Sequence, residues 1–383
     1  MLQRSIHLRS NFCVELNRSC TERGALSGII LPVVVFLEER ALSRTFAAVI
    51  MAAGKSTRMK SAIPKAAHLI CGKPMTRHVI DACREMGIAD VVVVIGHEAE
   101  KVKAALGNDV IYAYQTEQLG TGHACQQAMP LIPQNVTDVL VLPGDTPLIT
   151  AESLARLVEA HESQENTVTL LTAILDDASH YGRVVRDPDT GAVLRIVEAK
   201  DADPETLAIR EINTSIYCFD KLALEEKLSF LRADNAQQEY YLTDVIGLLN
   251  ETGQRVGAVV ADNAADTLGI NNRIELAQAA AIMRRRILNK LMLSGVTIVD
   301  PATTYIDCDV EIGPDTVIHP CTIIERGTKV SGGQSIGPFV KLCGVDVIRF
   351  AQDGSRCSHK DEQHSQINRQ AWNGELDPER HGR

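Results

Sequence analysis

The spacing of hydrophobic positions divides the chain into two regions. From residue 46 to about 270, short apolar runs such as 47–51 and 139–142 alternate with segments such as 76–86 and 98–106, where apolar residues recur every three or four positions. Short buried strands that alternate with amphipathic helices are typical of βαβ units. This order predicts an α/β fold with a doubly wound, mostly parallel, Rossmann-like sheet.

A different period follows. Every sixth position from 306 to 342 holds a large apolar residue, and the residues four places later are mostly small or β-branched. The apolar positions are Ile306, Ile312, Ile318, Ile324, Val330, Ile336 and Leu342. Such hexads predict a parallel β-helix in which three hexads form one triangular coil, whereas an antiparallel sheet, the alternative, would show a period of two. Because the repeat stops after Leu342, we expect a short, incomplete left-handed parallel β-helix.

The segment between the two regions is rich in Ala, Leu, Ile and Arg and predicts a linker helix that stops near Ser294-Gly295. A polar tail with few large apolar side chains follows the repeat, and an extension with its own charge pattern precedes the first strand. The tail is expected to be disordered, and the extension is either a disordered segment or the result of a start codon placed too far upstream. The expected divisions are 1–45 (extension), 46–270 (sheet domain), 271–295 (linker helix), 296–342 (β-helix) and 343–383 (tail).

Composition narrows the classes of function. The 383 residues carry a formal charge of −10, which argues against a nucleic-acid partner. The apolar run at 26–36 is too short to span a bilayer, so no membrane partner is expected. The ten cysteines show no Cys-x-x-Cys pair and no zinc-ligand spacing, which indicates thiols in a reducing, cytoplasmic environment.

The first strand leads into a loop of small residues. At Ala52, Ala53 and Gly54, backbone N–H groups can approach phosphate oxygens closely, and Arg58 and Lys65 can add charge-assisted hydrogen bonds to the same anion. The loop therefore predicts a site for a nucleoside triphosphate. The alternative is an ordinary turn between a strand and a helix.

Two familiar phosphate-binding loops are excluded by spacing. A P-loop would need a glycine where this chain has Val49, and a dinucleotide fingerprint would need glycines where it has Ser56 and Met59. The loop is therefore of a third type.

Two residues are candidates for a metal ion. Asp145 follows the strand 139–142 in the sequence Pro-Gly-Asp, and Mg²⁺ prefers one or two protein oxygens together with substrate phosphates. Asn271, at the start of the linker helix, can supply a neutral oxygen. The alternatives are a plain turn for Asp145 and a helix cap for Asn271.

A loop at 115–123 is a candidate for reading a nucleobase. Gln115 offers both an amide donor and an acceptor, and the glycines at 120 and 122 allow close backbone approach. The alternative is a merely flexible loop. His123 is interpreted as structural, since nucleotidyl transfer to an ionised phosphate needs no side-chain acid or base.

Taken in order, these motifs resemble those of one enzyme family. Residues 51–59, followed by Pro64-Lys65, resemble the signature of sugar-1-phosphate nucleotidyltransferases, with Met51 for leucine and Ser56 for glycine. The remaining motifs are Gln115, Gly120-Thr121, Gly144-Asp145, Tyr181-Gly182-Arg183, Ile196 to Glu198, Glu211 to Asn213 and Asn271. The set resembles the bacterial bifunctional N-acetylglucosamine-1-phosphate uridylyltransferases / glucosamine-1-phosphate acetyltransferases over residues 46 to 342, including the hexapeptide repeat.

The resemblance implies an enzyme that uses UTP, N-acetylglucosamine-1-phosphate and Mg²⁺. Arg58, Lys65 and Asp145 would be catalytic, and Asp145 and Asn271 would bind Mg²⁺. Met51, Ala52, Ala53, Gly54, Lys65, Gln115, Gly120, Thr121, Gly144, Asp145 and Asn271 would hold the nucleotide and the reacting phosphates, and Gly182, Glu198 and Asn213 the sugar. The resemblance also implies a homotrimer built through the β-helix.

The second activity of the family, acetyl transfer to glucosamine-1-phosphate, is expected to be lost, because its histidine and acetyl-CoA contacts belong to later coils. The sudden end of the repeat is interpreted as a shifted reading frame or an early stop. The alternatives are a nucleotidyltransferase for another sugar-1-phosphate and a non-catalytic, truncated remnant.

Overall fold

The computed structural model describes residues 44–178 and 181–348. The chain divides into two units, Met1–Thr45 and Phe46–Arg383. The disorder expected for the extension and for most of the tail concerns residues outside the described ranges.

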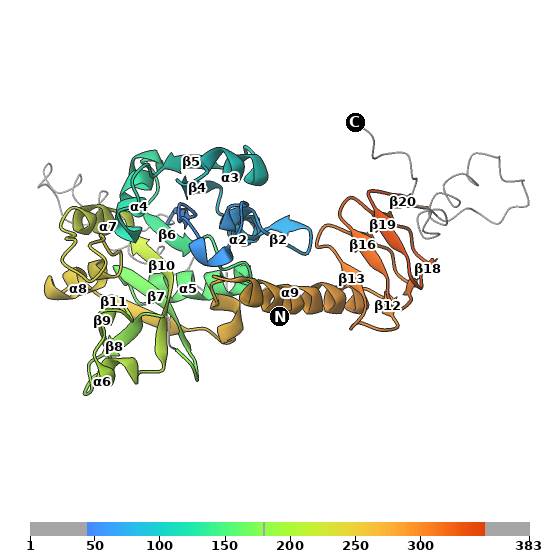
Figure 1. Cartoon of the computed structure of the whole chain (residues 1–383). Coiled ribbons are helices and arrows are strands. Elements are labelled where there is room, and N and C mark those ends of the chain that lie inside the picture. The colour runs from blue at the N-terminus through green and yellow to red at the C-terminus, as the bar shows by residue number, and fades with distance from the viewer. Residues whose placement is uncertain (1–43, 179–180, 349–383) are drawn as a thin grey trace, which may run out of the picture. The chain divides into compact units, whose positions relative to one another are not determined.

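A nine-stranded sheet forms the centre of the first domain (Figure 1). Its main path runs β11 (Val256–Val260), β7 (Val168–Ile174), β10 (Glu211–Asp220), β6 (Asp138–Pro143), β1 (Phe46–Met51), β4 (Asp90–Ile95) and β5 (Ile111–Tyr114). Off this path, β8 (Arg183–Arg186) pairs with β10, and β9 (Val193–Val197) pairs with β8. Neighbours on the path pair in parallel, except that β10 runs antiparallel to β6 and β7. The predicted mostly parallel sheet is confirmed.

Helices cover both faces of the sheet, because four consecutive residues of β1, from Ala47 to Ile50, are fully buried. Ala48 and Ile50 pack with residues of α2 (Met75–Glu85), α3 (Ala99–Leu106) and α5 (Ala151–Ser163). Ala47 and Val49 face the other way, toward α4 (Thr121–Ala128), α7 (Lys221–Leu228) and α8 (Asp244–Glu251). The short helix α6 (Pro204–Leu207) and the hairpin of β2 (Leu69–Ile70) and β3 (Lys73–Pro74) complete this domain. The fold is therefore doubly wound.

The predicted helix at 76–86 shows how the sequence sets an element's end. Val79 and Cys83 are fully buried on its inner face. Gly87 follows with φ +91°, where its N–H donates to the Arg84 carbonyl (2.9 Å) and the Ile88 N–H to the Cys83 carbonyl (3.0 Å). These two bonds form a Schellman motif, in which glycine takes the left-handed position without a steric penalty.

The order of the strands indicates where a ligand crevice is expected. The chain winds outward from β1 through β4 to β5 and then returns to β6 on the opposite side of β1. In open α/β sheets, ligands bind at the carboxyl ends of the strands where the order reverses. Here that point lies between the loop after Met51 and the loop after Pro143, and the Gly144 N–H donates to the Met51 carbonyl at 2.9 Å.

The linker is a single helix, α9 (Arg273–Leu293), close to the predicted range (Figure 1). Its cap is Asn272, whose Oδ1 accepts from the N–H groups of Ile274 (2.9 Å) and Glu275 (3.0 Å). The first turn thereby has two of its unpaired donors satisfied. The cap interpretation offered for Asn271 is wrong, because its neighbour fills that role.

Nine short strands follow in three parallel sheets, ordered β12-β15-β18, β13-β16-β19 and β14-β17-β20. Their bounds are β12 (Thr297–Ile298), β13 (Tyr305–Ile306), β14 (Glu311–Ile312), β15 (Val317–Ile318), β16 (Ile323–Glu325), β17 (Lys329–Val330), β18 (Ser335–Ile336), β19 (Lys341–Cys343) and β20 (Asp346–Val347). Ile318 and Ile324 are fully buried, as are Thr316 and Thr322. This arrangement is the predicted parallel β-helix.

The β-helix continues one strand past the boundary expected at residue 342. Val330 of β17 pairs with Val347 of β20, one residue short of the hexad count. The six-residue spacing would place Ile348 at this core position, but the side chain of Ile348 is 64% exposed. A shortened turn therefore moved the last strand out of the six-residue register, and the expected end was too early.

Candidate functional site

A cleft of about 640 Å³ opens at the carboxyl ends of β1 and β6. It brings together most of the residues proposed from the sequence for nucleotide and phosphate. These are Met51, Ala52, Ala53, Gly54, Arg58, Lys65, Gln115, Gly120, Thr121, Gly144 and Asp145. Lys55, Ser56, Thr57, Ala66, Thr76, Gln118, Ala124, Pro143, Ser215 and Glu239 also line it.

The loop after β1 leaves space where a phosphate could lie. A β-carbon built on Gly54 would meet no atom within 4 Å, so the missing side chain keeps the cleft open. Ser56 has φ 54° and ψ 39°, the left-handed conformation that favours glycine. Met59 is 1% exposed and anchors the loop. The position where the resembling family has glycine is thus strained in this chain.

The loop after β6 is held tightly. Thr76 of α2, which is fully buried, donates its hydroxyl to the Gly144 carbonyl (2.7 Å), and the Ile270 N–H donates to the Asp145 carbonyl (2.9 Å). A β-carbon on Gly144 would lie 3.0 Å from the Met51 carbonyl oxygen. The Asp145 backbone is therefore fixed by neighbours on three segments of the chain.

Charged side chains converge on two oxygens at this end of the cleft. The Lys65 ammonium pairs with Asp145 Oδ2 and donates to Asn271 Oδ1 (3.0 Å). Arg58 Nη2 donates to the same Asn271 oxygen at 2.8 Å. Asn271 is itself held by its N–H, which donates to Glu275 Oε2 at 2.5 Å. Residues more than 200 positions apart thus form one cluster.

The oxygen atoms of this cluster can be compared with the ligands that a divalent metal ion prefers. The carboxylate of Asp145 and the amide oxygen of Asn271 both face one cationic group, the Lys65 ammonium. Among the described residues, no group of three or more His, Cys, Asp or Glu side chains could hold a metal. Two protein oxygens suit Mg²⁺, which keeps waters and takes further ligands from substrate phosphates. The donor set fits that ion.

Another part of the cleft lining carries amide groups. Gln115 is 4% exposed, and its Nε2 donates to the Gly120 carbonyl (3.0 Å). Gly120 has φ +110°, and the segment around Tyr240 packs against it through two backbone bonds of 2.7 Å to Leu119 and Gly122. The loop is therefore ordered by contacts on both sides, and the interpretation as a merely flexible loop is not supported.

The residues proposed for a sugar form a second group beside the cleft. The Asn213 N–H donates to the Gly182 carbonyl (2.8 Å), and a β-carbon on Gly182 would lie 3.4 Å from Glu198 Oε2. The Asn213 side-chain oxygen accepts from the Ser215 N–H (3.1 Å), and Ser215 lines the cleft. Ser215 therefore connects the two groups of residues.

Glu198 is the carboxylate of this second group. Burial raises its pKa above the usual 4.5, and nearby carboxylates act in the same direction. The Thr243 hydroxyl donates to Glu198 Oε1 at 3.3 Å and opposes the shift. A half-buried carboxylate next to a glycine is suited to accept hydrogen bonds from sugar hydroxyls.

Sequence reasoning missed several cleft residues. Gln118, whose Nε2 donates to the Ala53 carbonyl (2.9 Å), lies within the loop singled out for base reading and could have been included. Thr76, Ser215 and Glu239 carry no comparable signal, because tertiary packing alone brings them to the cleft. His123 lies between the amides of Gln115 and Gln127, in keeping with its interpretation as structural.

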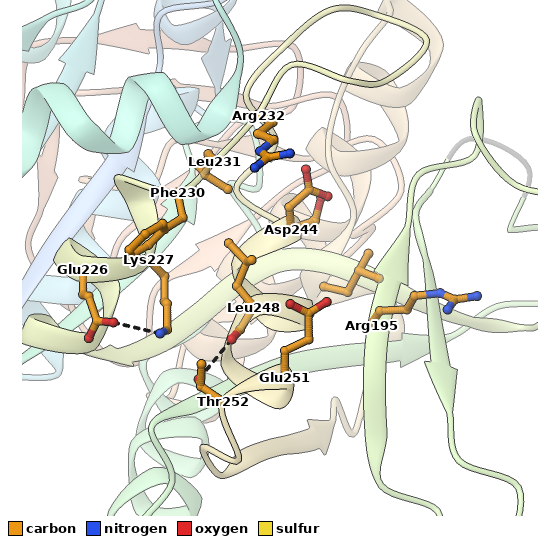
Figure 2. Close-up of a pocket in the computed structure, with 13 residues that line it drawn as sticks. Arg195, Glu226, Lys227, Phe230, Leu231, Arg232, Asp244, Leu248, Glu251 and Thr252 are labelled. Atoms are coloured by element: carbon orange, nitrogen blue, oxygen red, sulfur yellow. Dashed lines mark hydrogen bonds and ion pairs between the residues drawn. The ribbon is translucent and has the colours of Figure 1, made fainter.

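A second cavity, of about 730 Å³, lies between α7, α8 and β9 (Figure 2). Figure 2 shows Lys227 paired with Glu226, at 2.9 Å, near the ring of Phe230. None of the residues proposed from the sequence lies in this cavity, although Thr243, the donor to Glu198, is on its wall. The proposed chemistry therefore belongs to the cleft.

Comparisons with known proteins indicate which class of protein the sheet domain resembles. The MobA-like NTP transferase domain family matches residues 48–185. A solved structure described as a glucose-1-phosphate thymidylyltransferase from Bacillus anthracis superposes with a TM-score of 0.50 and 17% identity, covering 62% of this chain and 95% of that one. In the described part of the chain, no helix combines the length and apolar character needed to cross a membrane. The sheet domain therefore has the fold of a nucleotidyltransferase domain.

Longer matches to named relatives extend the likeness beyond this domain. Over 300 residues the chain is 49% identical to "Bifunctional protein GlmU" of Brevibacillus brevis and 50% identical to the protein of that name from Geobacillus sp.. In both cases the match covers 78% of this chain and 65% of the relative. The chain is similar to these two proteins and spans somewhat less than two thirds of their length.

Proposed function

We propose that this chain transfers a uridylyl group from UTP to N-acetylglucosamine-1-phosphate. An oxygen of the sugar phosphate attacks the α-phosphorus of UTP, the bond to the β-phosphate breaks, and pyrophosphate leaves with the electron pair. The observation that carries the proposal is one cleft lined by Arg58, Lys65 and Asp145 and also by Gln115 and Gly120, with Asn271 hydrogen-bonded to the two cationic side chains.

The residues of the chain serve mainly to position the two substrates and to neutralise the negative charge of their phosphates. Arg58 and Lys65 can bind phosphate oxygens, the open backbone at Gly54 admits the triphosphate, and Gln115 offers an amide to the base. Asp145 and Asn271 would hold a magnesium ion. Bound Mg²⁺ would supply charge neutralisation and orientation of the reacting phosphates. No covalent intermediate with the enzyme is required, so catalysis rests on geometry and electrostatics.

The direct test is pyrophosphate release by the purified chain with Mg²⁺, UTP and N-acetylglucosamine-1-phosphate. The same assay with other nucleoside triphosphates and other sugar-1-phosphates measures specificity. Highest kcat/KM for the UTP pair supports the proposal. Release only with another pair would assign the chain to a different sugar nucleotide, and no release from folded protein with any pair would favour a non-catalytic remnant.

One prediction concerns Ser56, the loop residue with a left-handed backbone conformation. Ser56→Val should lower kcat/KM for UTP about tenfold, because a β-branched residue is disfavoured in the left-handed region by roughly 1–2 kcal/mol. Ser56→Gly should keep or raise it. Thr57→Val, on the adjacent exposed position, is the matched control. Equal kinetics for the valine and glycine variants at 56 would show that catalysis does not need this loop conformation.

A second prediction concerns Glu198. Because burial raises its pKa, the ionised carboxylate destabilises the fold above the unfolded-state value of 4.5, and this penalty disappears at lower pH. Glu198→Gln should therefore raise Tm at pH 7 but not at pH 4, while KM for the sugar phosphate rises about tenfold, as for a lost charged hydrogen bond. Thermal scans at both pH values check it; a gain in Tm that does not change with pH would contradict the assignment.

The proposal is confined to the first of the two activities of the resembling family. We propose a cytoplasmic enzyme whose partners are UTP and the sugar phosphate, and a trimer through the β-helix, which light scattering can test. Acetyl transfer is expected to be absent from this chain, and an acetyl-CoA assay with glucosamine-1-phosphate tests that expectation.

A further inference from the structure

Two cationic side chains bind the oxygens that a metal ion would need. Lys65 contacts both Asp145 Oδ2 and Asn271 Oδ1, and Arg58 contacts the second of these. We propose that Lys65, assisted by Arg58, competes with the metal ion for Asp145 and Asn271 and keeps the metal site closed until nucleotide phosphates draw the two cations away. This inference rests on the proposed function, since it assigns those oxygens to a metal.

The geometry makes the competition direct. Mg²⁺ binds oxygen at about 2.0–2.1 Å, and the Lys65 nitrogen already lies 3.0 Å from Asn271 Oδ1. A metal on the same oxygens would lie against the ammonium group, and two cations at that distance repel strongly in a partly buried site. The side chains of Lys65 and Asp145 are only 16% and 27% exposed, so water screens them incompletely.

The consequence is that Lys65 and Arg58 exchange their partners when nucleotide binds. Without nucleotide, Lys65 neutralises the Asp145 carboxylate and keeps the cluster closed. A triphosphate presents stronger anionic partners to Lys65 and Arg58, which frees both oxygens for the metal. Metal and nucleotide then favour each other's binding, and this coupling is reciprocal. Lys65 therefore has two successive partners, first the metal ligands and then the substrate.

The test measures binding of Mn²⁺ without nucleotide, by electron paramagnetic resonance of the free ion and by calorimetry. Mn²⁺ favours the same oxygen ligands as Mg²⁺. Lys65→Met keeps the length of the side chain but removes its charge, and it should tighten Mn²⁺ binding about tenfold relative to the wild type, equivalent to about 1.4 kcal/mol. Adding Asp145→Ala to this variant should return binding to or below the wild-type level.

The matched control is Lys60→Met, which removes an exposed positive charge from the same loop. It separates direct competition from a general change in charge and should alter Mn²⁺ affinity less than about twofold, as expected for a solvent-screened charge. If Lys65→Met binds Mn²⁺ no more tightly than Lys60→Met, Lys65 does not close the site. Because this measurement uses no substrate, it decides the inference separately from pyrophosphate release, which decides the proposed function.

Discussion

Replacing Asp145 with alanine is expected to lower pyrophosphate release at least about 1,000-fold, because the variant lacks the only carboxylate proposed to hold the metal where charge develops. The fold should survive. The ion pair with Lys65 is partly buried, but Lys65 keeps its hydrogen bond to Asn271 Oδ1, so the change should lower the free energy of unfolding by only about 1–2 kcal/mol. Release is measured under saturating UTP and sugar phosphate, and stability by thermal unfolding.

Asp109→Ala is the matched control for this change. Asp109 also pairs with a cation, Arg77, at 2.6 Å, but it lies outside the cleft. Its variant should keep activity within about twofold, as is usual for an exposed ion pair. If Asp145→Ala kept more than a tenth of the wild-type rate, Asp145 would not be the metal ligand.

Gly120→Ala is expected to have a large structural effect in the part of the cleft that is proposed to bind the base. A β-carbon there would lie 2.6 Å from the Tyr240 carbonyl oxygen and 2.8 Å from its nitrogen, and φ is +110°. The obstacle is backbone, held by two 2.7 Å hydrogen bonds, so it cannot swing aside as a flexible side chain would. We expect a loss of about 3 kcal/mol in stability, as for severe overpacking, and a fall of about 100-fold in kcat/KM for UTP, equivalent to roughly 2.7 kcal/mol.

The control is Gly253→Ala. Gly253 also has positive φ, +71°, but a β-carbon there would meet no atom within 4 Å. It therefore reports the backbone strain alone, about 1–2 kcal/mol, without a clash. Denaturant unfolding compares the two variants, and kinetics with varied UTP checks the cleft. Similar losses of stability in both would mean that Tyr240 does not press on Gly120.

Sequence patterns predicted the elements whose burial repeats regularly. The continuous apolar run of β1 and the hexads of the β-helix are set by which side chains must face a core, so these patterns were enough to find the two elements. The loop after β1 and Asp145 could be placed together for a related reason, since strand ends of a parallel sheet share one edge.

Other features depend on contacts that no pattern encodes. Tyr240 reaches the loop at Gly120 only because the segment before α8 packs there, and β20 falls out of the hexad count because one turn is a residue shorter. The left-handed conformation of Ser56 could be suspected only where a glycine was expected. Two asparagines stand next to each other at the start of α9, and the sequence does not show which of them caps the helix. Only the backbone geometry shows that Asn272 is the cap.

The position of Asn271 also has a consequence for the order in which the site forms during synthesis. Lys65 and Asp145 are 80 residues apart, whereas Lys65 and Asn271 are 206 apart. A growing chain can therefore form the first pair while the oxygen of Asn271 has not yet been made, and contacts at such separations form late in folding. A ribosome-bound intermediate would hold the loop after β1 but lack one of the two residues proposed to bind the metal, so we expect the proposed metal site to form only after the sheet is complete.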